Sequence, residues 1–141
     1  VFAAQGQREK AKDCYLKVLA IKPTDSTTLY NLANLYVEEQ NWSKAEALYQ
    51  QALAICSFNV DALFNLGFVY EQQGKTDLAL KYYKSVLRYQ PDSADIHFRI
   101  ASLYAQAGNC AEANNSYSRV MALRPNLQGE ISTMMSKCGQ K

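Results

Sequence analysis

The sequence contains few residues that would interrupt a helix and few that would build a catalytic centre. Its 141 residues include three prolines, six glycines, one histidine and one tryptophan. The scarcity of proline and glycine leaves room for long helices. Apolar residues make up 48% of the chain and charged residues 20%, which is ordinary for a folded protein and excludes a disordered tail. A chain of this length suffices for one domain with a substantial core.

Long apolar runs and concentrated charge are also missing. No apolar stretch approaches the roughly 18 residues that a membrane span needs, so no membrane insertion is expected. The first residues, Val1 to Gly6, lack a basic region and a long apolar segment, so they do not form a signal peptide. They also lack an initiator methionine, and we expect the chain to be cut from a larger protein. Lysine and arginine are dispersed and the net charge is +2, which argues against a nucleic-acid partner.

The four cysteines form no recognisable metal or disulfide motif. Cys14, Cys56, Cys110 and Cys138 lie far apart, without a C-x-x-C pair, and His97 is the only histidine. This pattern predicts no zinc site. It also predicts that all four cysteines are free thiols in a reducing compartment, and hence an intracellular protein, cytoplasmic or alternatively nuclear.

Catalytic patterns are equally scarce. A nucleophile needs a base within hydrogen-bond reach, and the one histidine falls at a core-type position between Ile96 and Phe98, where it would pack as an aromatic substitute. No glycine-rich phosphate loop is present. We predict a protein that is not an enzyme, with no catalytic residue, no cofactor and no metal.

What the sequence does contain is a repeat with a period of 34 residues. Similar residues recur at this step along the whole chain, with no insertion to break the spacing. Alanine recurs at 11, 45, 79 and 113, tyrosine at 15, 49, 83 and 117, tyrosine again at 36, 70 and 104, and proline at 23, 91 and 125. A period of this length indicates stacked supersecondary units, which are stable only against their neighbours.

Each repeat is predicted to contain two helices. In the first half of a unit, apolar residues such as Leu29, Leu32 and Tyr36 recur at steps of three and four, as on one face of a helix. The helix ends are then marked by the pairs Gln40-Asn41, Gly74-Lys75, Gly108-Asn109 and Gly6-Gln7. A small alanine in the second helix would allow close approach, and the tyrosine four residues later would fill the gap towards the neighbouring hairpin.

This pattern resembles the tetratricopeptide repeat family. The signature positions are occupied by Leu66, Gly67, Tyr70, Gly74, Ala79, Tyr83 and Pro91. The resemblance implies an all-α fold, a right-handed α-solenoid of stacked antiparallel helix hairpins. The expected units are the second helix of a truncated repeat (1–25), three full repeats (26–59, 60–93 and 94–127) and a C-terminal capping helix (128–141).

The resemblance also implies a protein-interaction module, a scaffold or adaptor whose first helices line a concave groove for an extended peptide. Asparagine amides there could hold a peptide backbone, and aromatic rings could grip its apolar side chains. The predicted groove residues are Tyr30, Asn31, Asn34, Phe64, Asn65, Phe68, Phe98 and Arg99.

Two other functions are compatible with the same resemblance. Asn31 and Asn65 resemble an asparagine ladder in the repeat arm of O-GlcNAc transferase, which would make this chain the substrate-recruiting arm of a larger enzyme. Asn34, Asn65 and Arg99 fall where heat-shock co-chaperones clamp a chaperone's C-terminal tail. Tyr30 and Asp95, however, replace that clamp's lysines, and an acid there would repel a carboxylate.

A different kind of partner is suggested by the first predicted helix. The helix that would precede it is missing, so Phe2 and Tyr15 would be partly uncovered. An uncovered apolar surface favours association, and we therefore predict possible self-association through this uncapped N-terminal end.

Overall fold

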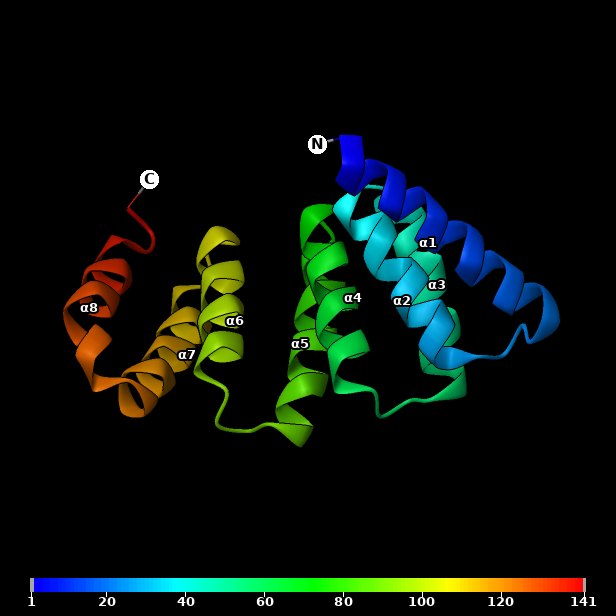
Figure 1. The fold of residues 1–141 in the computed structure, drawn as a ribbon. Coiled ribbons are helices and arrows are strands. Elements are labelled where there is room, and N and C mark those ends of the chain that lie inside the picture. Colours follow the sequence, from blue (N-terminus) through cyan, green and yellow to red (C-terminus); the bar gives the residue numbers. More distant parts are fainter. Residues whose placement is uncertain (1, 141) are drawn as a thin grey trace. The chain divides into compact units, whose positions relative to one another are not determined.

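The computed structural model describes residues 2–140, with side chains from residue 4 onward, and these residues form helices and turns without a strand (Figure 1). The all-α prediction is therefore confirmed. The helices are α1 (Phe2–Ile21), α2 (Ser26–Glu38), α3 (Trp42–Ile55), α4 (Val60–Gln72), α5 (Thr76–Tyr89), α6 (Ala94–Gln106), α7 (Cys110–Leu123), the short 3₁₀ helix η1 (Pro125–Leu127) and α8 (Gln128–Lys137).

Asparagine side chains begin three of these helices. The Oδ1 atoms of Asn41, Asn59 and Asn109 accept hydrogen bonds from the backbone N–H three residues later, at 3.4, 3.1 and 3.4 Å. Each of these bonds satisfies a backbone donor that has no partner within the helix. The caps therefore set where α3, α4 and α7 start.

Left-handed residues separate the two helices of a pair. Gly74 and Gly108 have φ angles of 73° and 79°, and Gln40 takes the same role with φ 57°. Glycine adopts this conformation at little cost, whereas a side chain at Gln40 is strained there. The predicted helix end at Gly6 was wrong, because α1 runs through Gly6 without a left-handed residue. A single glycine weakens a helix by only about 1 kcal/mol, so the flanking helical residues can carry the chain past it.

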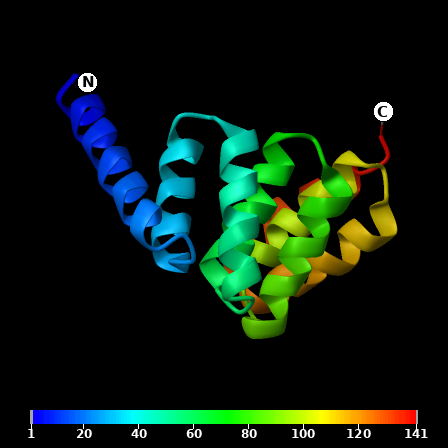
Figure 2. The same ribbon diagram turned by 90° about the vertical axis from the view of Figure 1, so that its right-hand side faces the viewer.

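The chain divides into two compact units, residues 1–79 and 80–141, with the boundary inside α5. In the first unit, α1 packs on α2, α2 on α3, and α3 on α4 (Figure 2). Its core is built from the residues that the repeat predicted to be apolar and small. The buried side chains include Leu29, Leu32, Ala33, Ala45, Tyr49, Ala62, Leu66, Val69 and Tyr70.

The second unit is centred on the α6–α7 pair, with η1 and α8 packed against α7. Ala101, Ala113, Tyr117, Val120 and Ile131 form one buried cluster, so helix α8 contributes a single fully buried residue, Ile131. Half-buried apolar side chains surround this cluster. They are Phe98, Tyr104, Ala105, Met121, Leu127, Met135 and Cys138.

The prediction of four free thiols was wrong for two of the cysteines. Cys110 and Cys138 form a disulfide with a Cα–Cα distance of 5.6 Å, while Cys14 and Cys56 are free. The bonded pair lies 28 residues apart in sequence. The α7–α8 turn brings the end of α8 back to the beginning of α7, and a scan for local cysteine motifs misses such a pair.

Between residues 2 and 140, no helix is long and apolar enough to cross a membrane.

Candidate functional site

The predicted groove residues of the first unit lie on its two neighbouring helices α2 and α4. Helix α2 carries Tyr30, Asn31 and Asn34, and helix α4 carries Phe64, Asn65 and Phe68. All six are half-buried, because each helix turns its more apolar face, with residues such as Leu32 and Leu66, into the core. We refer to these six residues as the α2–α4 surface.

Hydrogen bonds join the asparagines of this surface to one another. The Nδ2 group of Asn65 donates to Asn34 Oδ1 at 3.1 Å and to the Tyr30 hydroxyl at 3.4 Å. The hydroxyl of Tyr49, a buried residue of α3, also donates to Asn34 Oδ1. Residues from three helices thus form one amide–tyrosine network, defined here as Tyr30, Asn34, Tyr49 and Asn65. The repeat pattern predicted that Tyr49 fills the gap towards the neighbouring hairpin, but it did not predict the hydrogen bond to Asn34.

The network determines which polar atoms remain for a ligand. Asn34 uses its carbonyl oxygen twice, which leaves its Nδ2 donors, and Asn65 uses its Nδ2 group twice, which leaves its carbonyl oxygen as an acceptor. The side chain of Asn31 makes no hydrogen bond with any residue from 2 to 140. The surface can therefore both donate to and accept from a peptide group.

Burial makes Tyr49 a neutral member of the network. Its side chain is fully buried, and this burial raises the pKa of the Tyr49 hydroxyl well above its ordinary value of about 10. The nearby amide of Asn65 lowers the pKa and is the weaker effect, and the neighbouring Tyr30 raises the pKa slightly further. The hydroxyl therefore stays protonated and remains a donor to Asn34.

The aromatic rings of the surface are supported from below by other rings. Tyr30 lies 6.0 Å from Tyr49, centroid to centroid, and Phe68 lies 6.1 Å from Trp42 in an edge-to-face arrangement. Such pairs hold each ring in one orientation. Trp42, the first residue of α3, was not among the predicted site residues. Because the tryptophan occurs only once, the repeat pattern gave no signal for it.

The remaining predicted residues, Phe98 and Arg99, lie on α6 in the second unit and are half-buried. Phe98 packs edge-on against Tyr117 at 6.0 Å, which repeats the Tyr30–Tyr49 arrangement of the first unit. Asp95, at the start of the same helix, is ion-paired with Arg124 at 3.1 Å.

The single histidine is also on α6 and has a structural partner. His97 is half-buried, and its Nε2 lies 2.9 Å from the carbonyl oxygen of Pro91. It therefore packs at the turn before α6. No group of three or more histidine, cysteine or acidic side chains that could hold a metal occurs among residues 2–140.

Lysines stack on the tyrosines that recur at 36, 70 and 104. Lys12 and Lys44 lie 5.3 and 5.1 Å from the Tyr36 ring centroid, and Lys75 lies 5.5 Å from that of Tyr70. These lysines are not spaced at the repeat period, so the sequence did not reveal the contacts. The stacks stabilise helix packing by cation–π attraction.

The same contact occurs in the second unit. Lys84 lies 5.2 Å from the Tyr104 ring centroid and donates to its hydroxyl at 2.6 Å. Through these two contacts Lys84 stabilises the packing of α5 on α6, in addition to carrying an exposed charge.

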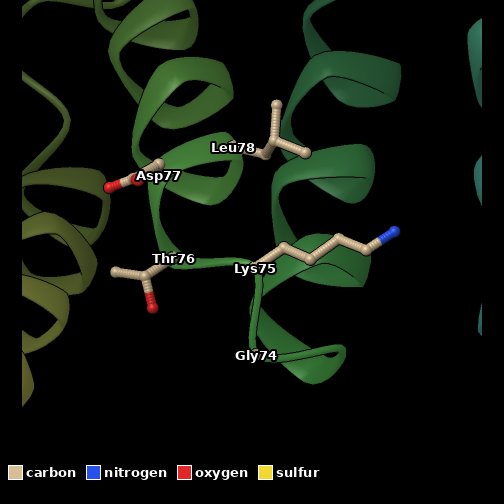
Figure 3. Close-up of a pocket in the computed structure, with 5 residues that line it drawn as sticks. All are labelled: Gly74, Lys75, Thr76, Asp77 and Leu78. Atoms are coloured by element: carbon tan, nitrogen blue, oxygen red, sulfur yellow. The ribbon is translucent and has the colours of Figure 1, made fainter.

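A shallow hollow at the α4–α5 turn lacks the converging side chains of a binding site. It is lined by Gly74, Lys75, Thr76, Asp77 and Leu78. Figure 3 shows Lys75 and Asp77 pointing in opposite directions, so their charges do not converge on one point. Lys75 instead forms an ion pair with Glu46 at 3.2 Å.

Comparison with known protein families gives the same family description along the chain. Three family profiles described as tetratricopeptide repeat match residues 1–25, 24–92 and 59–138. No curated protein sequence shows significant similarity.

Solved structures show the same fold. A crystal structure of MamA is 17% identical, with a TM-score of 0.80 over 98% of this chain and 88% of that one. A tetratricopeptide repeat protein from Parabacteroides merdae is 20% identical, with a TM-score of 0.86 over 97% and 56%. YrrB, described as a tetratricopeptide repeat protein with an unusual peptide-binding site, is 24% identical, with a TM-score of 0.78 over 87% and 63%.

Proposed function

The chain belongs to the tetratricopeptide repeat family, and we propose that it is a non-catalytic module that binds an extended segment of a partner protein along α2 and α4. In this proposal the chain contains three full repeats, at 26–59, 60–93 and 94–127, and they are flanked by the elements at 1–25 and 128–141. Repeats of this family are typical interaction modules, and a match to solved repeat structures along nearly the whole chain supports this general role.

The observation that carries the proposal is the orientation of the amides. An extended peptide presents alternating N–H and C=O groups, and each needs a partner when it leaves water. The unused Asn34 donors and the unused Asn65 acceptor form a complementary pair, and the network holds both amides in place. A preorganised pair loses less conformational entropy on binding than two mobile side chains.

The rings give the surface its affinity for apolar side chains. Tyr30, Phe64 and Phe68 are half-buried, so each presents part of its ring to solvent. Aromatic residues of this kind dominate interface energetics. YrrB, which has the same fold, is a peptide-binding repeat protein by its description, and this agrees with the proposal.

The charges near the surface favour a neutral or basic partner segment. None of its six residues is a lysine or an arginine. The nearby acid Glu38 is paired with Arg8 at 3.0 Å, and Asp61 is exposed. These six residues would offer no cation to an acidic C-terminal tail, and the nearby Arg8 is already paired with Glu38, which argues against the co-chaperone alternative.

The experiment selects binding peptides from a random displayed library on the immobilised chain and measures their affinity for variants. Asn31→Ala removes a hydrogen-bonding group that has no partner within the described protein, so folding should be unchanged. Affinity should fall about tenfold, or ~1.4 kcal/mol. Phe64→Ala should weaken binding at least as much.

The matched control is Lys81→Ala, at an exposed lysine of α5 that stacks on Tyr82. This change should leave the affinity within about twofold, since an exposed side chain away from the interface contributes little. Loss of binding in Lys81→Ala with full affinity in Asn31→Ala would contradict the proposal. Failure to select any peptide would do so as well.

Two further aspects remain predictions. The role of a substrate-recruiting arm of a larger enzyme, comparable to O-GlcNAc transferase, would require a catalytic domain in addition to residues 1–141. The cytoplasmic or nuclear location was inferred from four free thiols, and the Cys110–Cys138 disulfide removes that basis. Cell fractionation of the protein tests the location directly.

Self-association through α1 is a separate proposal. The side chain of Phe2 lies outside the described residues, and Tyr15 is half-buried. The better apolar candidates are Leu16, Val18 and Ile21, exposed by 50%, 40% and 88%. If α1 is an interface, Leu16→Glu should shift the sedimentation coefficient to that of a monomer.

A further inference from the structure

Helix α8 is held to the second unit by few apolar contacts. It is 10 residues long, and its one fully buried side chain is Ile131, exposed by 1%. Met135 and the preceding Leu127 are only half-buried against the same cluster. Isolated helices below about 12–15 residues are marginal in water. Something besides burial must therefore keep α8 docked.

The disulfide supplies a second attachment at the opposite end of α8. Chain connectivity through η1 holds its first residue, and Cys138, directly after its last residue, is bonded to Cys110 at the first residue of α7. Gly139 permits this arrangement. Its φ is 82°, and a Cβ atom there would lie 3.4 Å from Cys110 Sγ, so the backbone turns closely past the bond.

We propose that the Cys110–Cys138 bond is a redox-controlled clasp, and that its reduction by a dithiol releases α8 while the α6–α7 hairpin remains folded. Both cysteines are half-buried and so remain partly accessible to a small thiol. The hairpin keeps buried side chains outside the cluster that Ile131 joins, since Ile100 and Leu103 are buried on α6.

The chemistry is thiol–disulfide exchange with a dithiol as the two-electron reductant. One thiolate of the dithiol attacks Cys138 Sγ, which forms a mixed disulfide and breaks the bond to Cys110. Cys110 leaves as a thiolate at the start of α7, where the partial positive charge of the helix terminus favours an anion. The second thiol of the reductant then displaces Cys138 and becomes a cyclic disulfide, and both cysteines end as thiols after proton uptake.

The two states differ in the surface that they present. In the oxidised state, α8 covers one side of the cluster around Tyr117 and Ala101. In the reduced state, that apolar surface and Ile131 become accessible to solvent. The clasp thus makes the C-terminal end of the second unit closed or open according to the thiol–disulfide balance around the protein.

Hydrogen exchange of the whole chain, followed by mass spectrometry, tests the proposal. All samples carry Cys14→Ser and Cys56→Ser so that no free thiol can exchange with the bond, and the protein is first oxidised with oxidised glutathione. Dithiothreitol should accelerate amide exchange in residues 128–137 at least about tenfold, because α8 then opens locally. Amides in 96–104 and 113–120 should exchange at their original rates.

The matched control adds Cys110→Ser and Cys138→Ser. This protein should show fast exchange in α8 with or without dithiothreitol. Three results would overturn the proposal: equal α8 protection in the oxidised and reduced protein, simultaneous loss of protection in α6, α7 and α8, or a bond that is reduced only after global unfolding. Absence of a Cys110–Cys138 linked peptide in the non-reduced protein would overturn it too.

Discussion

Replacement of Tyr49 by phenylalanine tests the amide–tyrosine network through its dependence on pH. The change keeps the buried ring and removes one hydroxyl. Asn34 then loses one of its two donors, so the free energy of unfolding should fall by about 1 kcal/mol near neutral pH.

The sign of the pH effect follows from the raised pKa of Tyr49. The folded state keeps the proton that the unfolded chain releases above about pH 10, so the unfolded state is favoured as the pH rises. The stabilisation is complete below that pH and is lost as the pH increases towards the folded pKa. The loss amounts to about 1.4 kcal/mol for each pH unit above ~10.

The assay is urea unfolding, followed by circular dichroism at several values between about pH 8 and pH 11. The difference in the free energy of unfolding between the wild-type protein and Tyr49→Phe cancels the contributions of the other tyrosines. It should be about 1 kcal/mol at the lower pH and vanish within about one unit above pH 10. Tyr89→Phe, at a ring exposed by 51%, is the control and should leave the pH dependence unchanged. A difference that stays constant over the whole range would refute the reasoning.

Three further changes follow from the packing. Ala113→Phe should lower the free energy of unfolding by roughly 1–3 kcal/mol in urea titrations, because Ala113 is fully buried between helices and a ring overpacks the site; unchanged stability would exclude close helix approach there. Cys138→Ser should weaken the docking of α8 by about 3–4 kcal/mol, since the bond closes a long loop, while the α6–α7 hairpin stays folded, and wild-type hydrogen-exchange protection of α8 would exclude a formed disulfide. Lys84→Ala should cost less than about 1 kcal/mol, with a difference that shrinks in high salt, because its contacts with Tyr104 are exposed; a salt-independent loss would contradict the cation–π assignment.

The helices could be predicted from sequence because each repeat imposes the same local pattern. Leu32 and Leu66 occupy equivalent core positions, and Gly74 and Gly108 take the left-handed conformation that the pattern required. Gly6 shows the limit of this reasoning. The same residue type lies inside helix α1, without the left-handed conformation that Gly74 and Gly108 adopt.

The contacts between side chains of different helices were much harder to predict. Asn34, Tyr49 and Asn65 belong to three helices, and their hydrogen bonds depend on how those helices pack. Cys110 and Cys138 meet only because α8 folds back along α7. Periodicity identifies which face of a helix is apolar, but it contains no information on which polar atoms pair across that packing.

The central claim is that the α2–α4 surface binds a peptide through its amides, and side-chain amide resonances in nuclear magnetic resonance spectra test it most directly. Titration with a selected peptide should shift the Nδ2 resonances of Asn31 and Asn34 and the backbone amides around Phe64. The resonances of Lys81 and Arg88 on α5 should stay in place. Binding with unshifted asparagine side chains, and shifts confined to α5, would contradict the account.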